Sequence, residues 1–108
     1  MTDFADDDGP CVPPENFEGA EARAMRIVNR KGLHARATAK FVQCVERFDA
    51  EIRVTRAGET VGGDSIMGIL TLGAGLGTTI CVAARGSDAS AALDALGALV
   101  ANRFGEDE

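Results

Sequence analysis

The chain contains no tryptophan and no tyrosine, and its longest apolar runs are far too short to cross a bilayer. Its basic residues are few and no aromatic side chains accompany them, which argues against nucleic-acid binding. Residues 1–8 are acidic, whereas a secretory signal starts with basic residues and continues into an apolar stretch. We therefore expect a cytoplasmic protein that neither binds nucleic acid nor inserts into a membrane.

Cysteine is also scarce, with only Cys11, Cys44 and Cys81 along the chain. No pair has the C-x-x-C spacing of a metal site, and we expect neither a metal nor a cofactor. Reduced cysteines are the rule in the cytoplasm. We expect Cys44 and Cys81 to pack as small apolar residues in a helix and a strand, and Cys11 to be an accessible thiol.

The net charge of −6 is unevenly distributed along the sequence. Residues 1–22 hold seven acidic residues, no basic residue and all three prolines, and their few apolar residues show no periodicity. This composition predicts a flexible acidic tail over residues 1–22 and a single domain over residues 23–108. Basic residues gather around the only histidine and form either a solvated face or a docking surface for an acidic partner: Arg26, Arg30, Lys31, Arg36 and Lys40.

Hydrophobic periodicity predicts the element order β-α-β-β-α-β-α. The expected strands cover about residues 24–28, 51–56, 59–61 and 78–84, and the expected helices cover about 35–47, 66–72 and 90–103. Four short strands with helices between them are typical of an α+β fold. We expect a two-layer open-faced sandwich, in which a four-stranded antiparallel sheet carries three helices on one face.

The single histidine, His34, lies where the first strand gives way to the first helix. Free backbone N–H groups and the positive end of the helix dipole favour a negatively charged group there. If the imidazole carried a phosphoryl group, these amides and Arg36 could hold its oxygens. His34 and Arg36 are therefore candidate catalytic residues; the alternative for His34 is a surface residue or a local helix cap.

Two glycine-containing motifs have to be weighed against this interpretation. The stretch GAGLGTT (73–79) resembles a phosphate-binding loop, but it follows a helix, precedes a strand and lacks lysine, so it is better explained as a helix stop and a turn. The stretch GGDSI (62–66) resembles the core of peptidyl carrier domains, whose serine bears a phosphopantetheine arm. Those domains are four-helix bundles, whereas strand-like segments flank this motif. A pantetheine carrier that uses Ser65 and a regulatory binding module without phosphotransfer remain alternatives.

The strings GLHARAT (32–38) and DSIMGILTL (64–72) resemble the two signature regions of HPr, the histidine-containing phosphocarrier family of the bacterial phosphotransferase system. The resemblance extends over about residues 24–104. It implies that His34 accepts a phosphoryl group through Nδ1 from a phosphoenolpyruvate-dependent Enzyme I type protein, and passes it to an EIIA-type protein in sugar uptake or nitrogen-related regulation. Arg36 would balance the phosphoryl charge. Ala37 replaces the usual proline, and the GLHARA form and acidic C-terminus are more similar to the nitrogen-related branch, NPr.

The second signature region suggests further functional residues. By resemblance, Ser65 matches the serine that some HPr proteins present to a regulatory HPr kinase/phosphorylase, although a serine at a helix start also serves simply as a cap. Not every apolar residue of this short helix can face inward. We expect Ile66, Met67 and Leu70 to form a partner-binding surface; the alternative is a core face with one stray apolar residue.

Overall fold

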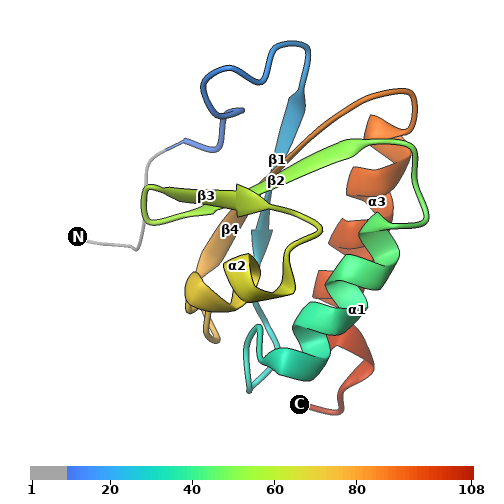
Figure 1. Cartoon of the computed structure of the whole chain (residues 1–108). Coiled ribbons are helices and arrows are strands. Elements are labelled where there is room, and N and C mark those ends of the chain that lie inside the picture. Colours follow the sequence, from blue (N-terminus) through green and yellow to red (C-terminus); the bar gives the residue numbers. More distant parts are fainter. Residues whose placement is uncertain (1–9) are drawn as a thin grey trace.

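The computed structural model describes residues 10–108 and contains the predicted elements in the predicted order (Figure 1). The elements are β1 (Glu21–Arg26), α1 (Ala35–Val45), β2 (Glu51–Arg56), β3 (Glu59–Gly62), α2 (Ile66–Thr71), β4 (Thr79–Arg85) and α3 (Ala89–Ala101), followed by a short 3-10 turn, η1 (Arg103–Gly105). The α+β open-faced sandwich is confirmed, and the bounds differ from the expected ones by a few residues at most.

The four strands form one antiparallel sheet in the order β1-β4-β2-β3. Figure 1 shows α1 and α3 running side by side across one face of this sheet. Residues two apart on a strand share a face, and the helix-facing positions of β2 and β4 are buried and apolar: Ile52, Val54, Ile80, Val82 and Ala84. The core therefore lies between the sheet and the helices.

The apolar face of α1 contributes Ala37, Phe41 and Cys44 to this core. Burial raises the pKa of the Cys44 thiol, so this cysteine behaves as the small apolar residue that the sequence predicted. α3 ends two residues earlier than expected, because the chain adopts positive φ at Arg103 (57°) and Phe104 (55°). This reversal puts the Phe104 ring in the core with 1% exposure.

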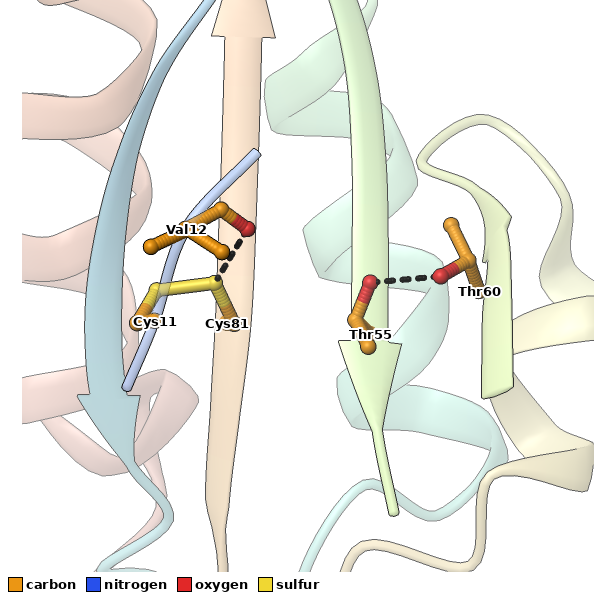
Figure 2. The surroundings of a disulfide bond; sticks show 5 residues. All are labelled: Cys11, Val12, Thr55, Thr60 and Cys81. Carbon is orange, nitrogen blue, oxygen red and sulfur yellow. Dashed lines mark hydrogen bonds between the residues drawn. A yellow bond between two sulfur atoms is a disulfide. The ribbon is translucent and has the colours of Figure 1, made fainter. Parts of the chain in front are cut away.

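Residues 10–20 contact the sheet in the structure, whereas the composition predicted a flexible tail over residues 1–22. Residues 1–9 lie outside the described residues, but β1 already begins at Glu21, and Cys11 forms a disulfide with Cys81 of β4. We expected Cys11 to be an accessible thiol and Cys81 to be a reduced, apolar residue of the sheet, and the disulfide shows that both expectations are wrong. Figure 2 shows the segment in front of β4 with helices behind the sheet, so it lies on the face that the helices leave open.

An aromatic ring provides the other contact of this segment. Phe17 is 4% exposed, and its ring centroid lies 4.8 Å from the guanidinium carbon of Arg53 and 4.4 Å from that of Arg85. Arg85 also donates a hydrogen bond to the Glu18 carbonyl. A cation over an aromatic face is attractive, so one ring can hold a segment that has no hydrophobic periodicity.

The loop before α1 packs tightly against the loop after α2. Gly32 has φ +68°, and a Cβ at this position would lie 2.6 Å from the Ala74 carbonyl oxygen. The Leu33 N–H donates to that same oxygen over 2.9 Å. Only glycine fits here without a clash. The glycine-rich stretch 73–77 lies between α2 and β4, as predicted for a helix stop and turn.

Candidate functional site

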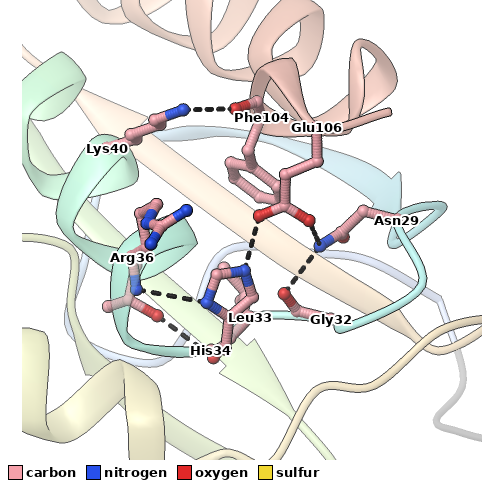
Figure 3. A network of polar contacts seen from close by, with 9 residues as sticks. Asn29, Gly32, Leu33, His34, Arg36, Lys40, Phe104 and Glu106 are labelled. Carbon is pink, nitrogen blue, oxygen red and sulfur yellow. Dashed lines mark hydrogen bonds and ion pairs between the residues drawn. The ribbon is translucent and has the colours of Figure 1, made fainter. Parts of the chain in front are cut away.

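His34 is the N-cap of α1, and its ring takes part in capping the helix (Figure 3). The imidazole Nδ1 accepts a hydrogen bond from the backbone N–H of Arg36 over 3.2 Å. In a neutral imidazole one nitrogen accepts while the other carries the proton. This contact therefore assigns the lone pair to Nδ1, where it faces the open helix N-terminus, and the proton to Nε2.

The other ring nitrogen of His34 contacts a carboxylate from the far end of the chain. Nε2 lies 2.5 Å from Oε2 of Glu106, and the side chains are only 27% and 18% exposed. Oε1 of Glu106 accepts from the amide nitrogen of Asn29 over 3.0 Å. Hydrogen bonds from Asn29 and then from His34 hold the pKa of Glu106 below its ordinary value of 4.5. Glu106 is therefore a carboxylate at neutral pH.

Asn29 is itself fixed by the surrounding backbone. Its side chain is fully buried, and its amide nitrogen also donates to the Gly32 carbonyl over 2.8 Å. This second bond ties the amide to the loop that presents His34. The buried side-chain amide of Asn29 thus links Glu106 to the loop that presents His34.

The C-terminal residues 103–108, which we call the C-terminal strap, bring Glu106 to His34. Phe104 anchors the strap in the core, and the Lys40 ammonium donates to the Phe104 carbonyl over 2.7 Å. Arg30 pairs with the Glu108 carboxylate over 2.7 Å, and its backbone N–H donates to the Glu108 carbonyl. Two members of the basic cluster around His34 therefore contact the C-terminal strap, Lys40 at a backbone carbonyl and Arg30 at a carboxylate.

Arg36, the second candidate catalytic residue, lies one residue into α1 and is exposed. Within residues 10–108 its guanidinium makes no hydrogen bond or ion pair, and only its backbone N–H is engaged, by His34. A surface pocket is lined by Arg36, Lys31 and His34, among others. The structure thus brings the two predicted catalytic residues together at one recess, whose lining also holds the acidic residues of the C-terminal strap.

The second signature region forms the short helix α2. Ser65 is its N-cap and is exposed, and the Ser65 hydroxyl accepts from the Gly68 N–H over 3.0 Å. Ile66 and Met67 are 42% and 72% exposed, whereas Leu70 is half-buried and Ile69 is fully buried. The apolar residues of α2 therefore divide between the core and the surface, as the helix geometry required.

Sequence reasoning missed Asn29 and Glu106. The signal for Glu106 was present in the composition, because three acidic residues end a chain whose basic residues cluster around the histidine. Nothing in the local pattern indicated Asn29, whose role depends on two contacts made by the folded chain.

Among residues 10–108, no helix has the length and apolar character needed to cross a bilayer.

Comparison with known proteins gives consistent matches. The family model PTS-HPr, described as the PTS HPr component phosphorylation site, matches residues 21–102. The chain is 46% identical to the phosphocarrier protein HPr of Cupriavidus necator over 86 residues, which are 80% of this chain and 97% of that protein. It is 43% identical to the phosphocarrier protein NPr of Shewanella violacea over 84 residues, 78% of this chain and 92% of that protein.

Solved structures agree with these matches. HPr-C-His from Thermoanaerobacter tengcongensis superposes with a TM-score of 0.78 at 38% identity, covering 82% of this chain and 99% of that one. HPr from Bacillus anthracis gives a TM-score of 0.74 at 41% identity, covering 77% and 99%. The family match begins at residue 21, so the segment that carries Cys11 and Phe17 lies outside it.

Proposed function

This chain belongs to the HPr family and is a phosphocarrier of the phosphotransferase system, and on that premise we propose that His34 is the residue that carries the phosphoryl group. The observation that supports this most directly is the hydrogen bond from the Arg36 N–H to Nδ1. It leaves a lone pair on Nδ1 at the N-terminus of α1, where the helix dipole favours the negative charge of an incoming phosphoryl group.

The proposed step is an in-line transfer. The Nδ1 lone pair, released from its hydrogen bond with the Arg36 N–H, attacks the phosphorus of the donor. The Nδ1–P bond forms, and the bond from phosphorus to the donor breaks with its electron pair leaving on the donor. Once Nδ1 is phosphorylated it can no longer accept from Arg36, so that N–H becomes free to donate to a phosphoryl oxygen. The unpaired guanidinium of Arg36 offers the balancing positive charge.

We further propose the partners. The donor is a phosphoenolpyruvate-dependent Enzyme I type protein and the acceptor is an EIIA-type protein, both in the cytoplasm. The exposed side chains of Ile66 and Met67, with the half-buried Leu70, offer an apolar docking surface on α2. Ser65, exposed at the start of the same helix, is the proposed target of a regulatory HPr kinase/phosphorylase.

Incubation with phosphoenolpyruvate and an Enzyme I type protein tests the central proposal. Intact-mass analysis should show one added phosphoryl group that is acid-labile, as phosphohistidine is, and His34→Ala should lose it completely because no second imidazole exists. Ser65→Ala, the matched control, should keep it. A mass matching a pantetheine arm that is lost in Ser65→Ala would instead support the pantetheine carrier. Undiminished acid-labile label in His34→Ala would refute the proposal.

A further inference from the structure

We infer that Glu106 is a positioning residue for the phosphocarrier histidine: its carboxylate holds the proton on Nε2 of His34 and thereby keeps the lone pair on Nδ1. The inference rests on the proposed role of His34. Two independent contacts carry it, because Nδ1 accepts from the Arg36 N–H while Nε2 lies 2.5 Å from a carboxylate oxygen of Glu106. A carboxylate is only an acceptor. Both contacts therefore require the same tautomer.

The position of Glu106 is set by more than its contact with His34. Its second oxygen accepts from the fully buried Asn29, whose amide nitrogen is also bonded to the Gly32 carbonyl. The strap that carries Glu106 is anchored by the buried Phe104 ring and by Lys40. Both carboxylate oxygens are thus occupied by donors from the loop before α1. This arrangement suits a group that orients another side chain, as carboxylates do for metal-bound histidines.

The reaction gives this contact a chemical consequence. When Nδ1 forms its bond to phosphorus, the proton stays on Nε2, so the phosphorylated ring is a cation. Glu106 lies against that proton and stabilises the cation. In onward transfer the Nδ1–P bond breaks, its electron pair returns to Nδ1, and the ring becomes neutral again with the proton still on Nε2. Arg36 acts on the phosphoryl oxygens, whereas Glu106 acts on the opposite side of the ring.

The charged groups around this pair come from three parts of the chain. Lys31, on the loop before α1, adds an attractive charge to Glu106. Arg30, on the same loop, is paired with Glu108 on the strap. Arg36, on α1, is free of ion pairs among the described residues. Glu106 is the acidic residue whose side chain contacts the ring, so removing its charge is a specific test.

Glu106→Gln removes the charge and keeps the shape, and the structure predicts what this substitution does. A glutamine has one acceptor oxygen and one donor nitrogen. It can accept from either Asn29 or His34 but not from both, and the other partner then faces an amide N–H. If His34 faces that amide, the acceptor moves to Nε2 and the proton moves to Nδ1. The matched control is Asp107→Asn, which removes one charge from the adjacent residue; the Asp107 side chain makes no hydrogen bond or ion pair within residues 10–108.

The first readout is the ring nitrogen chemical shifts of His34, which report which nitrogen carries the proton. Wild type and Asp107→Asn should show the proton mainly on Nε2, and Glu106→Gln should show a larger population with the proton on Nδ1. The second readout is the rate of phosphoryl acceptance and of onward transfer. Glu106→Gln should be slower than Asp107→Asn by about ten- to a hundredfold, by analogy with the range typical of metal-bound histidines that lose their outer-shell partner.

The two readouts separate this inference from the proposed function. If wild type accepts phosphoryl on His34 while Glu106→Gln matches Asp107→Asn in tautomer and rate, the role of Glu106 is refuted and the proposed function stands. If wild type accepts no phosphoryl group on His34, the proposed function fails, and the mechanistic role of Glu106 fails with it whatever the chemical shifts show. Both variants should remain folded at the assay temperature, because the substituted side chains lie outside the core, and a thermal melt of each variant excludes a folding defect as the cause of a slower rate.

Discussion

Cys11 is joined by a disulfide to Cys81, and the bond crosslinks the N-terminal segment to the sheet across a sequence separation of 70 residues. Cys81 lies in β4, between β1 and β2, on a strand that forms the middle of the sheet (Figure 2). The segment ahead of β1 thus becomes part of the folded unit, although the family match begins only at residue 21.

Cys11→Ser should lower the free energy of unfolding by about 2–4 kcal/mol in non-reducing buffer, because the crosslink restricts the unfolded chain. Thermal or denaturant melts measure this directly. In the presence of a reductant the wild type loses the same crosslink, so the two proteins should then melt together. Identical melting in non-reducing buffer would show that the bond does not stabilise the fold.

Phe17→Ala should lower the free energy of unfolding by about 1.5–3 kcal/mol, the range for burying a large apolar side chain. Val12→Ala is the control from the same segment, since the Val12 side chain is 60% exposed and should tolerate truncation with little change. Chemical denaturation of both variants measures the two changes in the free energy of unfolding. Equal stability of the two would mean that the segment contributes nothing beyond the disulfide.

The lowered pKa of Glu106 predicts a pH dependence of stability. Because the folded pKa lies below the ordinary value of 4.5, the contribution of this carboxylate is fully present above that value and is lost as the pH falls through the folded pKa. The stability difference between wild type and Glu106→Gln should therefore stay constant from neutral pH down to about 5 and shrink in more acidic buffer. Denaturant melts at a series of pH values measure it; a difference that grows on acidification would contradict the prediction.

Ser65 allows its capping role to be separated from its proposed regulatory role. Ser65→Ala removes the acceptor for the Gly68 N–H and should cost about 1 kcal/mol of stability. Ser65→Asp keeps an acceptor at the cap, so its melting temperature should stay close to that of wild type. The added charge lies next to Ile66 and Met67 and should weaken binding to an Enzyme I type protein. Wild-type affinity and transfer rate for Ser65→Asp would show that Ser65 is only a cap.

Most of the fold could be predicted because its determinants are local. Alternating residues in 51–56 and the three- and four-residue spacing in 35–45 specify a strand and a helix without reference to the rest of the chain. The first signature region also indicated His34 and Arg36 as candidate site residues, which the structure places at one recess.

The parts that escaped prediction depend on contacts between distant residues. Glu106 meets His34 across 72 positions, and this contact requires the reversal at Phe104 that ends α3. Phe17 is a single aromatic residue in a segment without periodicity, so its contacts with Arg53 and Arg85 leave no pattern in the sequence. Cysteine pairing likewise follows from the fold and cannot be deduced from spacing alone.

The tight packing at Gly32 has a consequence for how the phosphorylated protein behaves. A side chain at this position would collide with Ala74 and Gly75, so the two loops are in direct backbone contact. Neither loop can shift without pushing the other. His34 and the surface of α2 are therefore held rigidly relative to each other. We expect gain and loss of the phosphoryl group to change the electrostatic potential of this surface while its shape stays constant.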